Sequence, residues 1–240
     1  MTGVVAWLTG LPASGKSTIA GLAAEVLRRR GLRVEVLDGD WVRQHINTDV
    51  GFNREDRERH LLRSAWIARL LARNGVVVLA AFVSPYRDVR AKVRRIIEEE
   101  ARFLEVYVKV SLEEAIRRDP KGLYKRALMG EIKGFTGIDD PYEEPEAPDL
   151  VLDTSSLAPE EAAERLVEAV LAVNNKNGPP QSFMPCVEIP DGLLKRLEKA
   201  ARDAGYDDVA KYLSTLLEEI LAVKSDEDEI TKRLRDLGYV

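Results

Sequence analysis

One stretch near the start of the chain combines residues that bind phosphate. Positions 10–17 read Gly-Leu-Pro-Ala-Ser-Gly-Lys-Ser, after an apolar run at 4–8 and before a segment of helical period that begins at Thr18. Loop N–H groups and the positive end of a helix dipole surround phosphate oxygens in this strand–loop–helix context. A glycine-rich turn that caps an ordinary helix is the alternative. Because every fixed position of the motif is matched, the sequence predicts a nucleoside-triphosphate site.

The residues of this loop have separate expected roles. Lys16 supplies a positive charge for the β- and γ-phosphates, and the Ser17 hydroxyl is a candidate ligand for Mg²⁺. The residues expected to contact the nucleotide are Gly10, Leu11, Pro12, Ala13, Ser14, Gly15, Lys16, Ser17 and Thr18.

Two carboxylates follow the second predicted strand. Asp38 and Asp40 flank Gly39 directly after the run 33–37. Phosphoryl transfer to a hydroxyl needs Mg²⁺ near the phosphates and a carboxylate that orients the hydroxyl or accepts its proton. Asp40 is therefore the candidate base or metal ligand, with Asp38 in support. The alternative for either residue is a turn whose aspartate caps a helix at Trp41.

Several arginines are candidates for binding the anionic groups of a substrate. Arg43, Arg57 and Arg87 fall near the ends of predicted strands, and a guanidinium group can pair with anionic oxygens through two contacts. Arg59 and Arg63 follow Glu55 at intervals of four, so a solvated row of charges on a helix is the simpler interpretation for them.

Hydrophobic patterning predicts a doubly wound α/β fold with a parallel five-stranded sheet, because strands alternate with helices over residues 4–173. The strand at 76–83 is apolar throughout, which is typical of a strand buried on both faces. The active crevice should lie beyond the carboxyl ends of the strands. The expected strands are 4–8, 33–37, 76–83, 103–110 and 150–152, and the expected helices run from 18 to about 30 and over 55–74, 86–100, 112–117 and 159–173.

The segment 119–149 has no clear periodicity and is interrupted by glycines and prolines. Connections of this length in compact domains are usually functional or disordered. Its aromatic and basic side chains favour a lid over a ring-bearing, phosphorylated substrate, with a passive loop as the alternative. These side chains are Tyr124, Phe135, Tyr142, Lys121, Lys125, Arg126 and Lys133.

Over nearly all of residues 4–173 the chain resembles the adenylyl-sulfate kinases. The matching pieces are Trp7–Leu11, the phosphate loop, Leu37–Asp40, Gly51-Phe52 with Asp56-Arg57, and Ser84–Arg87. The lid is the most diagnostic, with Arg118–Lys125, Ile132–Ile138 and Pro141–Glu143. A phosphate loop is common to many kinases, whereas this lid sequence is typical of far fewer kinase families.

The resemblance implies transfer of the γ-phosphoryl group of ATP to the 3′-hydroxyl of adenylyl sulfate in sulfate assimilation, with Mg²⁺ as cofactor. It also implies that Phe52 and Phe135 enclose the acceptor's adenine, that Arg43 and Arg57 hold its phosphosulfate, and that Asp40 faces its 3′-hydroxyl. Ser84 is a possible phosphoryl carrier in the family; since direct in-line transfer needs no carrier, we expect Ser84 to position a substrate. The remaining expected contacts are Arg118 for the nucleotide and Asp38, His60, Val83, Arg87, Lys121 and Lys133 for the acceptor.

Three residues depart from the family pattern. Trp41 and His60 stand where the family usually has asparagine, and Leu62 stands where it has arginine. A kinase acting on another small hydroxyl compound is therefore the alternative function.

Composition limits the other possibilities. The 240 residues carry a net charge of −5, which argues against a general nucleic-acid surface. The longest apolar run, 76–83, is too short to cross a bilayer, and the start of the chain does not resemble a signal peptide. The single cysteine, Cys186, excludes an internal disulfide and suits the reducing cytoplasm, where we expect the protein to act.

The carboxyl-terminal quarter predicts a separate module. A kinase domain over 1–174 is followed by a polar linker, 175–182, and by a strand–helix–helix pattern with a short terminal helix over 183–240. This pattern resembles a ribbon-helix-helix module and is too small to bury enough surface alone, so we expect a homodimer or higher homo-oligomer. Residues 176–240 contain 10 basic and 13 acidic side chains, which favours association over the alternative of an ATP-binding regulator that recognises DNA.

Overall fold

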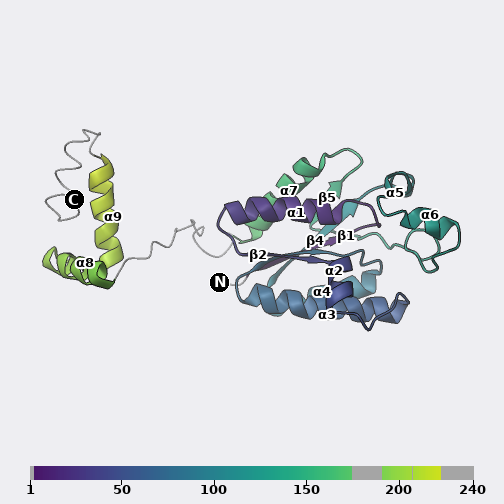
Figure 1. The fold of residues 1–240 in the computed structure, drawn as a ribbon, viewed down its shortest axis with the longest axis horizontal. Coiled ribbons are helices and arrows are strands. Elements are labelled where there is room, and N and C mark those ends of the chain that lie inside the picture. The colour runs from purple at the N-terminus through teal and green to yellow at the C-terminus, as the bar shows by residue number, and fades with distance from the viewer. Residues whose placement is uncertain (1–2, 175–190, 207, 223–240) are drawn as a thin grey trace. The chain divides into compact units, whose positions relative to one another are not determined.

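The computed structural model describes residues 3–174, 191–206 and 208–222, and the chain divides into two units, residues 1–184 and 185–240. In the described part of the first unit, five parallel strands form one sheet in the order β2-β3-β1-β4-β5 (Figure 1). The strands are β1 (Val4–Thr9), β2 (Val34–Asp38), β3 (Val77–Ala81), β4 (Arg102–Lys109) and β5 (Leu150–Asp153). The predicted α/β fold is confirmed.

Helices cover both faces of the sheet. Figure 1 shows α1 (Lys16–Arg29) and α7 (Pro159–Asn174) on one side, with α3 (Arg54–Arg73) and α4 (Arg87–Glu98) on the other. The period of two along β1 explains this layering. Val4, Ala6 and Leu8 join the core under α1 and α7, whereas Val5 and Trp7 join the core against α3 and α4. Every residue of β1 and β3 is buried, as the apolar runs predict.

A short helix that the strand–helix pattern did not include follows β2. This helix, α2 (Gly39–His45), begins because the Asp38 carboxylate accepts hydrogen bonds from the backbone N–H groups of Asp40 and Trp41. The capping alternative for Asp38 is therefore what the structure contains. The predicted strand at 76–83 ends at Ala81, and residues 82–86 form a connection in which Ser84 has a φ of 46°.

The lid segment is also more ordered than its sequence suggested. After α5 (Leu112–Arg118) it contains α6 (Leu123–Leu128), a helix too short for its periodicity to be recognised. The Asp119 carboxylate accepts hydrogen bonds from the N–H groups of Tyr124 and Lys125, which fixes the start of α6.

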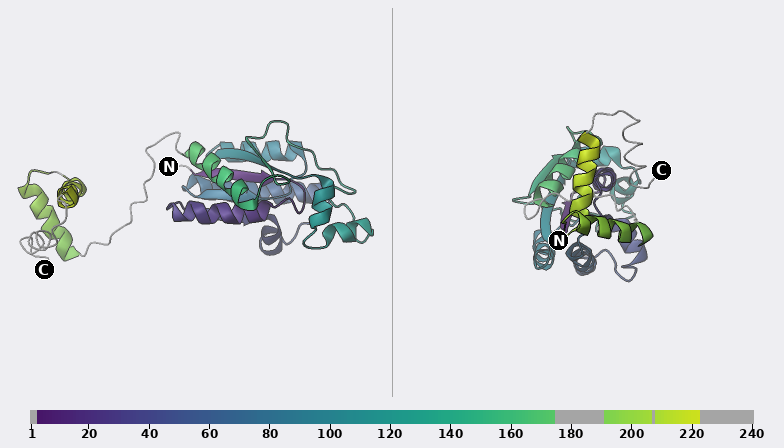
Figure 2. Two further views of the ribbon diagram at one scale, coloured as in Figure 1. Left: turned by 90° about the horizontal axis from the view of Figure 1, so that it is seen from above. Right: turned by 90° about the vertical axis from the view of Figure 1, so that its left-hand side faces the viewer.

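In the second unit, α8 (Asp191–Asp203) and α9 (Val209–Ala222) pack together, and Figure 2 shows that they cross steeply. Leu197 and Ala201 of α8 are buried, while Leu194 is exposed. The predicted linker 175–182, the predicted strand near 183–189 and the terminal helix lie outside the described residues, and the domain limits remain predictions. None of the described helices is long and apolar enough to cross a membrane.

Candidate active site

The loop between β1 and α1 is closed by contacts among its own residues. Lys16 Nζ donates to Gly10 O, Leu11 O and Ser14 Oγ over 3.0, 2.7 and 3.2 Å. A Cβ atom at Gly10 would lie 2.4 Å from Val108 O, so only glycine allows β4 to approach this closely. These backbone demands explain why the motif is readable in the sequence.

The ammonium group of Lys16 is buried, with 8% of the residue exposed. Burial lowers the pKa of Lys16 to about 7, against the opposing influence of the Asp40 and Asp38 carboxylates. A cation with so little solvation is strongly stabilised by an anion placed beside it. The loop is therefore well suited to a phosphate group.

The two carboxylates of the Asp-Gly-Asp turn have different contacts. Asp38 Oδ1 caps α2, and its Oδ2 accepts a 2.5 Å hydrogen bond from the Ser17 hydroxyl. Asp40 instead forms a 2.5 Å ion pair with Lys121 of the lid, and both of these side chains are largely exposed. Asp38 thus holds Ser17 and α2 in place, whereas Asp40 is exposed and pairs with the lid.

The donor set at this place suits Mg²⁺ in a nucleotide complex. Mg²⁺ takes oxygen ligands and, when phosphate is present, is usually held by one or two protein oxygens and several waters. The Ser17 hydroxyl and the aspartates of the turn supply such oxygens. Among the described residues no cluster of three or more His, Cys, Asp or Glu side chains is arranged to hold a metal by itself.

Two arginines meet the turn that contains Phe52. Arg43 donates to Val50 O and Gly51 O, and its guanidinium lies 4.5 Å from the centre of the Phe52 ring. Arg57 donates through Nε to Phe52 O. Burial and the neighbouring Arg57 charge both lower the pKa of Arg43, so an anion bound between the two cations would be stabilised.

The lid contacts one of these two arginines. Arg57 donates to Thr136 Oγ1 over 2.8 Å and to Gly134 O over 2.5 Å. Phe135, between these two residues, packs its ring edge-on against Tyr124 at 5.0 Å, while Phe52 is 64% exposed. The predicted acceptor residues Arg57 and Phe135 are thus brought together from distant parts of the chain. Lys133 is exposed on the lid.

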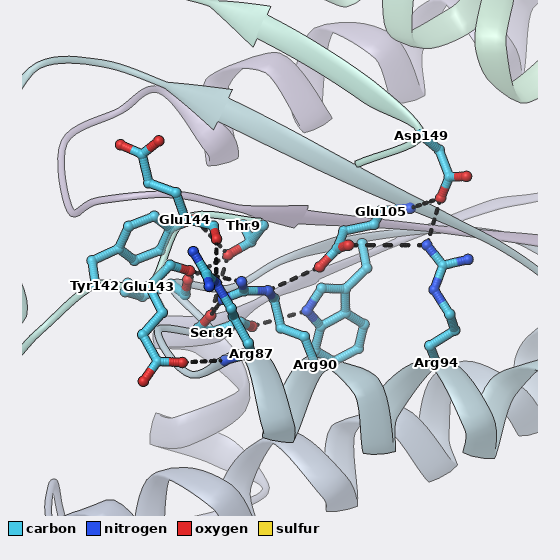
Figure 3. A network of polar contacts seen from close by, with 12 residues as sticks. Thr9, Ser84, Arg87, Arg90, Arg94, Glu105, Tyr142, Glu143, Glu144 and Asp149 are labelled. Atoms are coloured by element: carbon cyan, nitrogen blue, oxygen red, sulfur yellow. Dashed lines mark hydrogen bonds and ion pairs between the residues drawn. The ribbon is translucent and has the colours of Figure 1, made fainter. Parts of the chain in front are cut away.

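Ser84 is placed differently from a phosphoryl carrier. It is 1% exposed, with φ of 46°, and its Oγ accepts a 2.9 Å hydrogen bond from Trp7 Nε1. The Val83 carbonyl accepts a hydrogen bond from the Thr9 hydroxyl. Arg87 donates to the backbone oxygen of Glu144 (Figure 3). It also pairs with Glu146, so its guanidinium binds the returning lid segment and is not free for an anion. The burial of Ser84 and its hydrogen bond from Trp7 disfavour the carrier role.

A buried arginine that the sequence reasoning did not select lies at the centre of Figure 3. Arg90 is 3% exposed and donates to Glu105 Oε1, Ser84 O and Glu143 O. It thereby joins α4, the turn after β3, β4 and the lid. The sequence does contain a sign of this burial, because Arg90 lies three residues before Val93 and therefore on the apolar face of α4.

Arg118, predicted to contact the nucleotide, lies next to the phosphate loop. It donates to Thr154 O and Thr154 Oγ1, and the Thr154 hydroxyl in turn donates to Ser14 O. A cavity of about 840 Å³ lies nearby and includes Leu11, Ser111, Gly137 and Asp153 in its lining. The cavity is large enough for a nucleoside, although neither Lys16 nor Asp40 lines it.

Comparisons with known proteins agree on one family. Residues 2–153 match the profile of the family described as Adenylylsulphate kinase. A probable adenylyl-sulfate kinase of Aeropyrum pernix is 63% identical over 172 residues, which are 71% of this chain and 94% of that protein. The structure of the Mycobacterium tuberculosis APS kinase CysC in complex with AMPPNP and APS is 40% identical, with a TM-score of 0.69, and the match covers 70% of this chain and 98% of that chain. A hexameric APS kinase from Thiobacillus denitrificans is 31% identical, with a TM-score of 0.53 and coverage of 70% and 29%.

Proposed function

The chain belongs to the adenylyl-sulfate kinase family, and from that premise we propose that Asp40 and Lys16 carry out γ-phosphoryl transfer from ATP to the 3′-hydroxyl of adenylyl sulfate. The products are 3′-phosphoadenylyl sulfate and ADP. The observation that carries this proposal is the Lys16 ammonium, buried inside a phosphate-binding loop next to the Asp-Gly-Asp turn. Such a cation stabilises the charge of the transferring phosphoryl group.

Asp40 is the candidate group for the acceptor hydroxyl. Its carboxylate is exposed, and its charge acts on both Lys16 and His60 from α2. It orients the hydroxyl or accepts its proton during an in-line transfer. Asp38 does not compete for this role, since both of its carboxylate oxygens are occupied by Ser17 and the start of α2.

Mg²⁺ is the expected metal, and Ser17, Asp40 and the phosphates would hold it. When bound, it neutralises charge on the β- and γ-phosphate oxygens. The Ser17 hydroxyl, which donates to Asp38, has the oxygen lone pairs that Mg²⁺ requires.

The acceptor is proposed to bind between α2, α3 and the lid. Arg43 and Arg57 supply two adjacent guanidinium groups for the phosphosulfate. The exposed ring of Phe52 can stack on adenine. Phe135 lies on the lid between Gly134 and Thr136, both of which accept hydrogen bonds from Arg57. Lys121, paired with Asp40, brings a lid cation to the reacting groups.

A coupled assay of ADP release, with and without adenylyl sulfate, tests the proposal. We expect ADP release that requires both adenylyl sulfate and Mg²⁺, and its loss in Lys16→Ala. ADP release with another small hydroxyl compound, but not with adenylyl sulfate, would instead support a kinase with a different acceptor. Trp41 motivates this alternative because it is 51% exposed and directly follows Asp40.

We also infer that the second unit mediates self-association. Its two helices bury Leu197 and Ala201 but leave Leu194 exposed on the same helix. The related Thiobacillus denitrificans protein is hexameric, which supports self-association of this chain. Sedimentation of the full chain is expected to give a mass of at least two subunits.

A further inference from the structure

Behind the proposed acceptor site, a buried asparagine contacts a buried histidine. Asn47, in the turn after α2, is 1% exposed, and His60 of α3 is 4% exposed. Asn47 Nδ2 lies 2.8 Å from His60 Nδ1 and 3.3 Å from the backbone oxygen of His60. A second residue, Ser64, donates its hydroxyl to that same backbone oxygen over 2.7 Å.

These distances determine which ring nitrogen carries the proton. A backbone oxygen only accepts hydrogen bonds, so the Asn47 group that faces His60 O is the NH₂ group and not the amide oxygen. The same NH₂ group faces His60 Nδ1, which must therefore accept the other hydrogen through its lone pair. A neutral imidazole whose Nδ1 is unprotonated has its hydrogen on Nε2.

The surroundings also keep the ring neutral. The charged groups that act on it come from α2, where Arg43 disfavours the imidazolium and Asp40 favours it. From the end of β3 the uncharged Phe82 packs edge-on at 5.5 Å. Burial is the largest influence and lowers the pKa of His60 to about 4. Among the described residues Nε2 makes no hydrogen bond, so its N–H is available to a ligand.

We propose that Asn47 is a positioning residue for the acceptor: it holds His60 as the neutral tautomer whose Nε2–H donates to an oxygen of the substrate. The inference rests on the proposed function, since the acceptor site is the one formed around Arg43, Arg57 and Asp40. A substrate oxygen, whether of the ribose or of the phosphosulfate, can only accept from this group. An imidazolium, or a ring with its hydrogen on Nδ1, would not be equivalent.

The tautomer can be measured directly by two-bond ¹H–¹⁵N correlation NMR of the full-length protein. The sequence contains only two histidines, so His45→Gln leaves the signals of His60 alone. We expect an unprotonated Nδ1 and a protonated Nε2, unchanged between about pH 5 and pH 8. A protonated Nδ1 in this range would overturn the proposal, whatever the activity of the enzyme.

Two matched variants separate the ring contact from the backbone contact. In Asn47→Asp the carboxylate accepts from Nδ1–H, so the proton moves to Nδ1 and the pKa of His60 rises. Ser64→Ala removes a hydrogen bond to the same residue but leaves the ring contact intact. We expect Asn47→Asp to weaken adenylyl sulfate binding about tenfold, with a new pH dependence near neutrality, while Ser64→Ala does neither.

The remaining controls distinguish the possible failures. His60→Asn retains an N–H donor and is expected to bind adenylyl sulfate within about threefold of the unaltered protein, a change below 1 kcal/mol. Binding of an ATP analogue should be the same in all variants. If Asn47→Asp moves the proton to Nδ1 without weakening adenylyl sulfate binding, the positioning role is wrong. If the unaltered protein does not bind adenylyl sulfate at all, the proposed function fails, whereas the NMR result still reports the state of the ring.

Discussion

The phosphate loop and the acceptor side of the crevice are built in opposite ways. In the loop, Lys16 contacts residues two to six positions away in the sequence. On the acceptor side, Arg57 reaches Thr136 across 79 residues, and Lys121 reaches Asp40 across 81. The first site is a local structure that folds around its own backbone. The second exists only when the lid packs against α2 and α3. Substitutions should therefore affect the two sites in different ways.

The largest effect is expected from Lys16→Ala. Loss of a buried cation from the loop should lower kcat by at least about 10³-fold, because no other described side chain replaces this charge at the phosphates. The midpoint of thermal unfolding should not fall, since the ammonium is poorly solvated in the folded protein. Measurable turnover at a tenth of the normal rate would contradict a role in the chemical step.

The next effect concerns Asp40→Asn, which keeps the shape of the side chain and removes its charge. We expect kcat to fall about 10²–10⁴-fold, the range typical for loss of a general base. Stability should change little, because the ion pair with Lys121 is exposed. Asp38→Ala is the comparison: it removes the side-chain cap of α2 and should lower the unfolding temperature, unlike Asp40→Asn.

A third prediction concerns pH and the acceptor side. His60 has a pKa of about 4 when folded, well below that of an exposed histidine. Between these values the unfolded chain binds more protons, so stability should fall as the pH drops from about 6.5 to about 4, by about 3 kcal/mol in total. Urea unfolding at a series of pH values measures this loss. In His60→Asn the loss should be smaller by that amount, and an unchanged profile would show that the ring is not held neutral.

Phe52→Ala sharpens the comparison on the acceptor side. Its ring is 64% exposed, so truncation should leave the fold unchanged. Loss of stacking should weaken adenylyl sulfate binding by about 1–3 kcal/mol, with much less effect on an ATP analogue, as measured by calorimetric titration. Phe135→Ala should weaken the acceptor similarly but also lower stability, because that ring packs on Tyr124. Equal losses for both substrates in Phe52→Ala would indicate a general disturbance of the lid.

The smallest effect on turnover is expected when the second unit is removed. A chain that ends at Lys176 keeps the hydrogen bonds from Arg102 to the carbonyl groups of Val173 and Asn174. All proposed site residues precede this end, so kcat/KM should stay within about twofold, a difference well under 1 kcal/mol. The number of subunits in the particle, measured by sedimentation, should fall. A folded but inactive truncated protein would show that the second unit contributes to the site.

The sequence by itself determined the strands, the helices around them and the phosphate loop. Their signals are local: β-branched apolar runs for the buried strands, and glycines where the loop must approach β4 or turn. The lid sequence likewise indicated the family without any structure. By contrast, α2 and α6 have too few residues for a periodicity to be recognised, and their starts depend on the capping side chains Asp38 and Asp119.

Only the tertiary structure decided the separate roles of similar residues. Asp38 and Asp40 are equivalent in sequence, yet one is occupied by Ser17 and α2 while the other faces the lid. Arg87 and Arg90 lie one turn of a helix apart, yet Arg87 pairs with Glu146 at the surface, whereas buried Arg90 joins β4 to the lid. The physical reason is that a hydrogen bond is set by distance in space, and these partners are joined by packing of the lid and not by spacing along the chain.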